Sequence, residues 1–319
     1  MDVVCLGELL VDMFPAEQGR QLGQVSAFQP KPGGAPANVA VSLARLGVDS
    51  AFIGKVGDDA FGHHLAELLA HEGVTIEGIR FDKDARTTLA FIAMPDADHA
   101  EFLFYRNPGA DTRLHASELD DQMLGDSKIF HFGSLSLVEN PIRSAVTKAI
   151  EIVSAAGGMV SLDVNYRPTL WDSPSSASKE VMAIMPSVNL LKVNEDELTL
   201  LSGGSDIESG TKTLMDSGPE MVIVTLGDNG SYFRTADGAD FSAAFEVKTV
   251  DATGCGDAFI AGVLARLIRA EDWRTQLSKA NMKANLRFAN AVGALTAQKL
   301  GVIPALPNHK EVHKFLAEN

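Results

Sequence analysis

The sequence predicts an α/β protein in which a mostly parallel sheet carries helices on both of its faces. From Lys128 onward, short apolar runs of strand length alternate with longer segments whose apolar residues recur at helical spacing. Repeated alternation of this kind is typical of βαβ units, which pair their strands in parallel. Of the 319 residues, 45% are hydrophobic and 22% are charged, which is the balance of a packed globular protein.

The expected elements follow in chain order. The first part of the chain should form strands at 2–10 and 51–56, a helix at 60–71, and a hairpin of strands 87–94 and 101–106 around a turn at 95–98. Later strands are expected at 129–132, 159–163, 189–193 and 221–226, and later helices at 141–155, 195–201, 255–269 and 278–299. Because no Ser-, Gly- or Pro-rich linker divides the chain, we expect a single domain over 1–319 with a small β lid from about 14–29 and 87–106.

Charge and composition argue against several classes of partner. Lysine and arginine number 27 against 42 acidic residues, which gives a net charge of −15 with no basic stripe, so no nucleic-acid partner is expected. The first ten residues lack a basic region and no run reaches about 18 apolar residues, so neither a signal peptide nor a membrane partner is expected. Two cysteines, Cys5 and Cys255, suit a reducing compartment, and a cytoplasmic location is expected.

The motifs of several common enzyme classes are missing from the sequence. There is no P-loop, no G-x-S-x-G elbow and no H-E-x-x-H. The run that begins Gly254-Cys255-Gly256 fails the dinucleotide pattern G-x-G-x-x-G because Phe259 occupies its last position. An NAD-dependent oxidoreductase is therefore disfavoured.

The strongest functional signal is segment 250–259, which reads VDATGCGDAF and runs into an apolar helix. Gly254 and Gly256 leave backbone amides unobstructed at the N-terminus of that helix, where unpaired N–H groups and the helix dipole favour an anion. Asp257, in the first helical turn, could accept a proton from a hydroxyl while a phosphoryl group is held beside it. The structural alternative is that Asp257 only caps the helix.

The second signal is segment 31–40, which reads KPGGAPANVA. Gly33 and Gly34 would let a ligand approach the backbone closely. Asn38 follows on the helix that continues from them. The structural alternative is an ordinary glycine loop with Asn38 as a buried cap.

Together these segments resemble the paired signatures of the ribokinase-like sugar kinases, also called the phosphofructokinase-B family. The resemblance runs from Val3 to Pro307. Further stretches are similar to fructokinases in particular: 7–12 (GELLVD), 51–59 (AFIGKVGDD), 104–108 (FYRNP), 163–167 (DVNYR) and 301–304 (GVIP).

The resemblance implies a three-layer α/β/α core with a small β-sheet lid, and an ATP-dependent kinase that phosphorylates a primary hydroxyl of fructose. It implies Asp257 as the catalytic base and the backbone of Gly254, Cys255 and Gly256 as an anion hole. Sugar contacts are then expected from Asp12, Gly33, Gly34, Asn38, Arg106 and Arg167. Nucleotide contacts are expected from Asn194, Thr225, Gly227, Gly230 and Asn290.

The same resemblance implies the accessory groups. ATP is the co-substrate, and Mg²⁺ would be organised through water by Glu197 together with Asn194. Many members of the family hold a monovalent cation where this chain has Asp251, so K⁺ is an expected option. A homodimer through the lid is a further expectation.

Three alternatives remain open on the sequence. Arg106 and Arg167 could clamp a carboxylate, which would suit 2-keto-3-deoxygluconate. Ribose or a nucleoside would use the same fold. A non-catalytic sugar-binding regulator would have no need of the base Asp257 or of Glu197.

Cys255 departs from the family pattern, which usually has alanine there. A helix N-terminus favours the thiolate, whereas the neighbouring carboxylate of Asp257 opposes it, so the sign of the shift in the thiol pKa is left open. A group attached to this thiol would block the anion hole, so we expect alkylation to inactivate the enzyme. A buried, inert Cys255 is the alternative.

Overall fold

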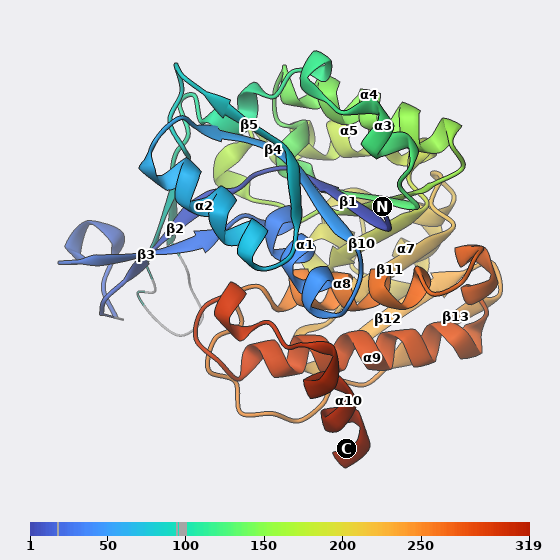
Figure 1. Ribbon diagram of the computed structural model, residues 1–319. Coiled ribbons are helices and arrows are strands. Elements are labelled where there is room, and N and C mark those ends of the chain that lie inside the picture. Colours follow the sequence, from blue (N-terminus) through green and yellow to red (C-terminus); the bar gives the residue numbers. More distant parts are fainter. Residues whose placement is uncertain (18, 94, 96–100) are drawn as a thin grey trace.

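The computed structural model describes residues 1–17, 19–93, 95 and 101–319. Within these residues, its main sheet contains β1 (Val3–Leu6), β4 (Ser50–Gly57), β5 (Thr75–Asp82), β8 (Ile129–Gly133), β9 (Met159–Asp163), β10 (Leu190–Asn194), β11 (Met221–Thr225), β12 (Ser231–Thr235) and β13 (Gly238–Ser242). The strand order is β13-β12-β11-β10-β9-β8-β1-β4-β5 (Figure 1). The strands from β11 to β5 pair in parallel, whereas β12 and β13 form an antiparallel hairpin at one edge.

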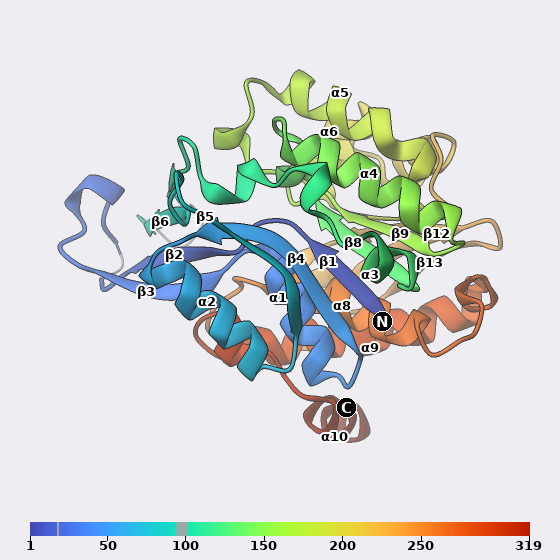
Figure 2. The same ribbon diagram turned by 45° about the horizontal axis from the view of Figure 1, so that its top comes forward.

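Helices cover both faces of this sheet (Figures 1 and 2). One face carries α1 (Ala35–Arg45), α2 (Ala60–His71), α8 (Cys255–Leu267), α9 (Lys279–Ala297) and α10 (His309–Glu318). The other carries α3 (Asp121–Gly125), α4 (Ile142–Ala155), α5 (Pro174–Ile184), α6 (Glu195–Ser202) and α7 (Ile207–Met215). In β1, Val3 and Cys5 enter the first core, while Val4 and Leu6 enter the second. Because both faces of β1 are buried, its sequence is apolar throughout and does not alternate between polar and apolar residues. The helices on both faces of a mostly parallel sheet confirm the predicted α/β fold.

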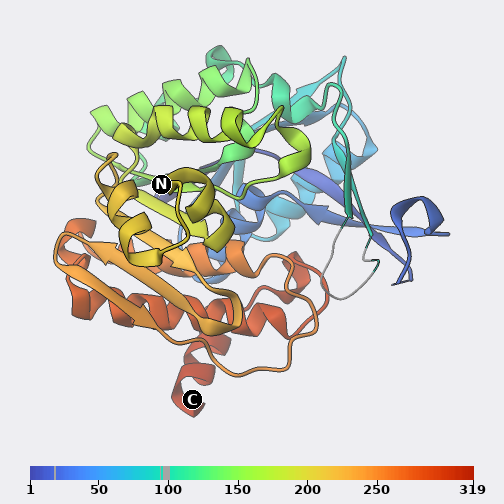
Figure 3. The same ribbon diagram turned by 180° about the vertical axis from the view of Figure 1, so that it is seen from behind.

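A second, smaller sheet stands at one side of the core (Figures 1 and 3). It has the order β3 (Phe28–Gly33), β2 (Leu10–Pro15), β6 (Leu89–Ala93) and β7 (Glu101–Tyr105). The β6–β7 pair is antiparallel, as the predicted hairpin requires, although most of the expected turn at 95–98 lies outside the described residues. In the first region the paired strands cover 10–15 and 28–33, so they extend beyond the expected 14–29.

The single strand expected at 2–10 is wrong, because the chain changes sheets within it. β1 ends at Leu6 and β2 begins at Leu10 in the small sheet. Gly7 passes so close to α1 that a Cβ on it would lie 2.5 Å from Pro36 Cγ. The apolar residues on both sides of this crossing conceal it in the sequence, and it brings the β2 residue Asp12 over the end of the main sheet.

None of the helices in the described part of the chain combines the length and apolar character that a bilayer-spanning helix needs.

Candidate active site

Two neighbouring cavities lie where the parallel strands end at their carboxyl termini, the usual ligand position in a sheet of this kind. The larger has a volume of about 460 Å³ and the smaller about 290 Å³. Ala252 and Gly256 line both cavities. The start of α8 therefore forms their common boundary.

The backbone at the start of α8 turns sharply at Gly254, whose φ is +78° and ψ −1°. The Cys255 N–H donates to Ala252 O at 3.2 Å, which closes a type II turn with glycine at its third position. A Cβ on Gly254 would lie 2.3 Å from Val302 Cγ1, so close packing also requires glycine. The turn therefore occupies the Cys255 N–H, which the sequence analysis expected among the anion-hole donors.

The helix leaves other amides available. The Ala258 N–H bonds Gly254 O at 2.9 Å, while in the described part of the chain the N–H groups of Gly254, Gly256 and Asp257 have no backbone acceptor. Unpaired amides at a helix start carry partial positive charge. The start of α8 can therefore receive an anion through Gly254, Gly256 and Asp257.

Asp257 lies at this boundary with only 8% of its surface exposed. Its carboxylate Oδ2 accepts a hydrogen bond of 2.8 Å from Asn38 Nδ2. Burial raises the pKa of Asp257 to about 7, with Asp163 adding to the rise, while the Asn38 bond, Lys192 and Arg167 lower it. A carboxylate with this pKa can take up a proton near neutral pH.

Asn38 reaches Asp257 because Gly34 starts α1 directly against the segment that links β1 to β2. Gly34 has a φ of +109°, and a Cβ on it would lie 2.3 Å from Glu8 O. Asn38 then lies one turn into α1, where its N–H donates to Gly34 O at 2.9 Å. The two glycine-containing segments of the sequence thus meet in space through Asn38 and Asp257.

Asp12 also lines the smaller cavity, and Gly33 makes room for it. A Cβ on Gly33 would lie 2.0 Å from Asp12 Oδ2, so only glycine lets this carboxylate lie across β3. Burial raises the pKa of Asp12 to about 7; Arg167 lowers it, and Asp257 and Glu8 raise it further. Gly33, which the sequence analysis expected to contact the sugar, does not itself line either cavity.

The two arginines of the sequence analysis have different positions. Arg167 lines the smaller cavity, and its guanidinium carbon lies 5.9 Å from the Phe102 ring centre. Arg106 is 7% exposed and its Nη2 lies 2.6 Å from Asp111 Oδ2. Of the two arginines, both expected to contact the sugar, only Arg167 lines the cavity, and Arg106 pairs with Asp111 instead.

The structure adds a buried ion pair that the sequence analysis did not include. Lys192 Nζ lies 2.9 Å and 3.0 Å from the two carboxylate oxygens of Asp163. A Cβ on Gly256 would lie 3.2 Å from Lys192 Nζ, so this ammonium lies beside the start of α8. Burial disfavours the charged ammonium, but Asp163, Glu197 and Asp257 outweigh it and raise the pKa of Lys192. The signal in the sequence was a lysine within the apolar strand run 189–193.

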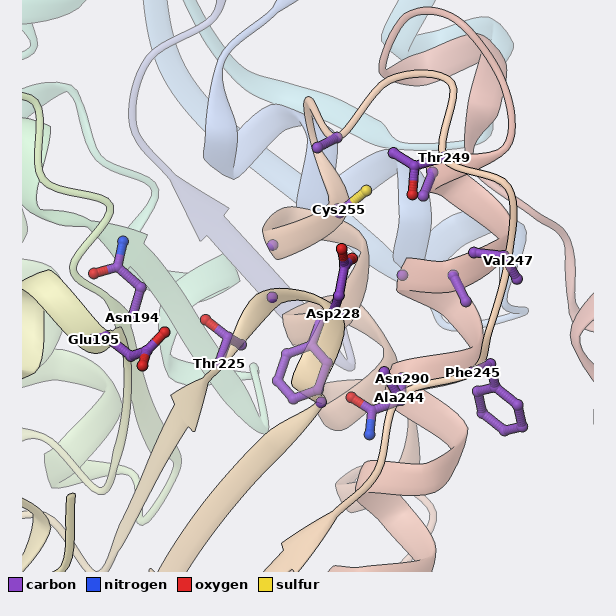
Figure 4. Close-up of a pocket in the computed structure, with 18 of the residues that line it drawn as sticks. Asn194, Glu195, Thr225, Asp228, Ala244, Phe245, Val247, Thr249, Cys255 and Asn290 are labelled. Atoms are coloured by element: carbon purple, nitrogen blue, oxygen red, sulfur yellow. The ribbon is translucent and has the colours of Figure 1, made fainter. Parts of the chain in front are cut away.

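All five residues expected to contact a nucleotide line the larger cavity: Asn194, Thr225, Gly227, Gly230 and Asn290. Figure 4 labels Asn194, Thr225 and Asn290 among them. Asn290 Nδ2 donates to Ser242 O and Ala243 O, both at 3.1 Å, and so fixes the wall that follows β13. That wall includes Phe245 and Val247, whereas Asp228 and Cys255 lie at the α8 side of the cavity. The cavity therefore has an apolar part and a polar part.

Glu197 and Asp251 line neither cavity. The Glu197 carboxylate accepts backbone N–H bonds from Asn194 at 2.8 Å and Tyr166 at 2.7 Å, and burial raises its pKa although Lys192 lowers it. Asp251 accepts N–H bonds from Thr253 and Gly301, each 2.9 Å long. Both carboxylates hold loops of the site in place. In the described ranges no group of three or more His, Cys, Asp or Glu side chains is arranged to hold a metal ion.

Cys255 is half-buried at the edge of the larger cavity (Figure 4). Burial raises the pKa of its thiol to about 12, and the carboxylates of Asp251, Asp257 and Asp228 add to the rise. The sequence left open the direction of the shift in the thiol pKa, and in the structure the shift favours the neutral thiol.

Alkylation of Cys255 should accordingly be slow at neutral pH. Inactivation by iodoacetamide should accelerate as the pH rises, because the thiolate is the reacting species, and MgATP should slow it. Cys255→Ala should keep its activity and lose the sensitivity, while the fully buried Cys5 should contribute nothing. Rapid inactivation of the wild type at pH 7 that Cys255→Ala abolishes would contradict the neutral-thiol assignment.

Comparison with known proteins places this geometry in a family. The model of the pfkB family carbohydrate kinases matches residues 1–309. Probable fructokinase-2 of Arabidopsis thaliana is 43% identical over 315 residues, covering 98% of this chain and 95% of that protein. Fructokinase-2 of Solanum lycopersicum is 42% identical, with the same two coverages of 98% and 95%.

Solved structures agree with the sequence relatives. Fructokinase of Xylella fastidiosa with bound ATP superposes with a TM-score of 0.91 at 31% identity, covering 99% of this chain and 98% of that one. Fructokinase of Vibrio cholerae O395 with fructose, ADP and calcium bound gives a TM-score of 0.89 at 34% identity, with the same coverages of 99% and 98%. The chain therefore belongs to the pfkB family of carbohydrate kinases.

Proposed function

We propose that this carbohydrate kinase transfers the γ-phosphoryl group of ATP to a primary hydroxyl of fructose. The observation that carries the proposal is the position of Asp257, a buried carboxylate at the start of α8, where the two cavities meet. Relatives named as fructokinases over nearly the whole chain support the choice of sugar. A sugar-binding regulator would have no use for a proton acceptor poised at this boundary.

In this mechanism fructose occupies the smaller cavity and the polyphosphate of ATP reaches it past α8. Asp257 takes the proton of the attacking hydroxyl as its oxygen bonds to the γ-phosphorus, and the bond from that phosphorus to the β,γ-bridging oxygen breaks to release ADP. The amides of Gly254, Gly256 and Asp257 and the ammonium of Lys192 stabilise the charge on the transferred group. Lys192 suits this role because it is buried beside Gly256 and remains protonated.

The small sheet would act as a lid over the sugar. Ile92 of β6 and Phe102 and Phe104 of β7 already line the smaller cavity. Such apolar side chains would exclude water, which competes with the sugar as phosphoryl acceptor. The nucleotide base would lie in the larger cavity between Phe245 and the Asn290 region of α9.

The polar part of the larger cavity has oxygen atoms that could bind Mg²⁺. Asn194, Glu195 and Asp228 present oxygen atoms there, the ligand type that Mg²⁺ prefers, commonly with water in between. When bound, Mg²⁺ would neutralise charge on the polyphosphate. Glu197 would act indirectly, because it fixes Asn194 through a reciprocal helix cap.

We also propose a potassium site near Asp251. Both Asp251 oxygens already accept backbone N–H bonds, so the ion would depend largely on other oxygen atoms of this loop. A Vibrio cholerae O395 fructokinase variant was crystallised in a potassium-bound form.

The charges around the smaller cavity favour a neutral sugar over a sugar acid. Glu8, Asp12 and Asp257 line it, against Arg167 and Lys192, and Asp163 already pairs with Lys192. Among the described residues that line this cavity, an added carboxylate on the substrate would meet one cation that forms no ion pair, Arg167. 2-Keto-3-deoxygluconate is the second candidate on account of that arginine.

A substrate panel tests this choice. With release of ADP from ATP as the readout, fructose should give the highest kcat/KM, above 2-keto-3-deoxygluconate, ribose and glucose. Arg167→Ala should raise KM for the sugar more than KM for ATP, because Arg167 lines only the smaller cavity. Turnover of 2-keto-3-deoxygluconate far above that of fructose would reject fructose as the substrate.

We also propose a homodimer through the lid. Leu103 and Tyr105 of β7 are 46% and 63% exposed, and the Tyr105 ring lies 5.2 Å from that of Phe91, so the outer face of the small sheet is apolar. Light scattering should give twice the chain mass for the wild type, and Tyr105→Glu should shift it toward one chain. A wild-type protein that remains monomeric at high concentration would contradict the proposed homodimer.

A further inference from the structure

We propose that Glu8 binds a hydroxyl group of the sugar and makes the enzyme select substrates that carry that hydroxyl. Glu8 lines the smaller cavity, and its side chain is 5% exposed. Glu8 lies between β1 and β2, at the crossing between the two sheets. The inference rests on the proposed function, because it takes the smaller cavity as the sugar site.

The two oxygens of the Glu8 carboxylate have different surroundings. Oε1 accepts a hydrogen bond of 2.9 Å from the backbone N–H of Ala35, the first residue of α1. Oε2 is buried and has no hydrogen-bond partner among the described residues. One oxygen therefore anchors the helix that carries Asn38, and the other is a free acceptor.

A second free acceptor lies in the same cavity. Asn38 Oδ1 is also buried without a partner among the described residues, while Nδ2 of the same amide holds Asp257. A buried polar atom that lacks a partner is costly, and a carboxylate oxygen more so than a neutral one. Two such acceptors on one polar cavity indicate a ligand with several hydroxyl donors, which is the chemistry of a sugar.

The positive charge that acts on Glu8 comes from Arg106, which forms no hydrogen bond with it. Burial raises the pKa of Glu8, and the charge of Arg106 opposes that rise, but Nε and Nη2 of the Arg106 guanidinium bond Asp111 at 2.7 Å and 2.6 Å. Arg106 therefore favours the negative charge of Glu8 without bonding it, and Oε2 keeps no hydrogen-bond partner among the described residues. A site built around such an acceptor discriminates strongly against an analogue that lacks the hydroxyl, because the acceptor is then left unpaired.

The test compares Glu8→Gln with the wild type on a sugar and on its single-deoxy analogues. The substituted amide keeps an oxygen for the Ala35 N–H and removes the charged acceptor from the cavity. We expect kcat/KM for the parent sugar to fall roughly 10- to 100-fold, which is the usual effect of losing a hydrogen bond to a charged group. For the one analogue that lacks the bonded hydroxyl, wild type and Glu8→Gln should differ by less than about threefold.

Two further variants keep the comparison decisive. Glu8→Asp retains the charge but withdraws it by one methylene, and it should give the same selective pattern if Glu8→Gln does not fold. Glu72→Gln removes a carboxylate that pairs with Arg45 at the other end of α1, and it should affect the parent sugar and all analogues equally. Equal losses on every analogue with the Glu8 variants, or no loss at all, would show that Glu8 only anchors α1 and would overturn the proposal.

The series is built on whichever sugar gives the highest wild-type kcat/KM. A lack of activity with fructose would therefore reject the proposed substrate, while the comparison at Glu8 would still be made on the sugar that is used.

Discussion

Replacement of Asp257 by asparagine should lower kcat by at least ~10²-fold while KM for the sugar changes little. Asparagine keeps the shape of the side chain, and its carbonyl oxygen can still accept the 2.8 Å bond from Asn38. It cannot take the proton of the attacking hydroxyl. Stopped assays of ADP formation with saturating MgATP and sugar measure the effect directly.

The outcome separates catalysis from structure. Asp257 is buried, so thermal unfolding must show that the variant is folded at the assay temperature. A folded Asp257→Asn enzyme with most of its kcat would mean that Asp257 has only a structural role, through its hydrogen bond with Asn38. A sharp rise in KM with unchanged kcat would make it a binding residue instead.

Replacement of Lys192 by methionine should damage both stability and catalysis. Removal of one partner from a buried ion pair leaves the other charge uncompensated, and here Asp163 would remain buried without Lys192. The expected loss in the free energy of unfolding is about 3–5 kcal/mol, measurable by urea denaturation. In addition, kcat should fall because the ammonium beside Gly256 is lost.

The double replacement of Lys192 by methionine and Asp163 by leucine distinguishes the two effects. An apolar pair of similar volume often restores stability that a single replacement loses. We expect the double variant to regain most of the free energy of unfolding and none of the kcat. Recovery of activity together with stability would mean that Lys192 has only a structural role.

The sequence predicted the core better than its edges. Strands β8 to β11 were predicted because the βα alternation repeats after Lys128, although the sequence analysis did not predict helices α5 and α7 in that region. The crossing from β1 to β2 was missed because its apolar flanks hide the break at Gly7 and Glu8. Strand β5 was missed as well, since it combines charged and apolar residues at the edge of the sheet.

Within the site, residues that form local motifs were easier to place than residues that act across the sheet. Gly254, Asp257, Gly34 and Asn38 lie at helix starts that the sequence reveals. Lys192, in contrast, becomes meaningful only once β9 and β10 pair side by side. The sequence around Arg106 likewise gave no sign that its guanidinium pairs with Asp111, five residues later in the chain.

The pH dependence of kcat/KM for the sugar tests the assignment of the base most directly. Burial raises the pKa of Asp257 to about 7, and only the deprotonated carboxylate can accept the proton. The rate should therefore fall as the pH drops through about 7 and level off above it, with Asp12, whose pKa is also about 7, contributing to the same apparent transition. In the residual activity of Asp257→Asn the part of the transition due to Asp257 should disappear. A wild-type profile that is flat from about pH 5.5 to 8.5 in a folded enzyme would contradict Asp257 as the general base.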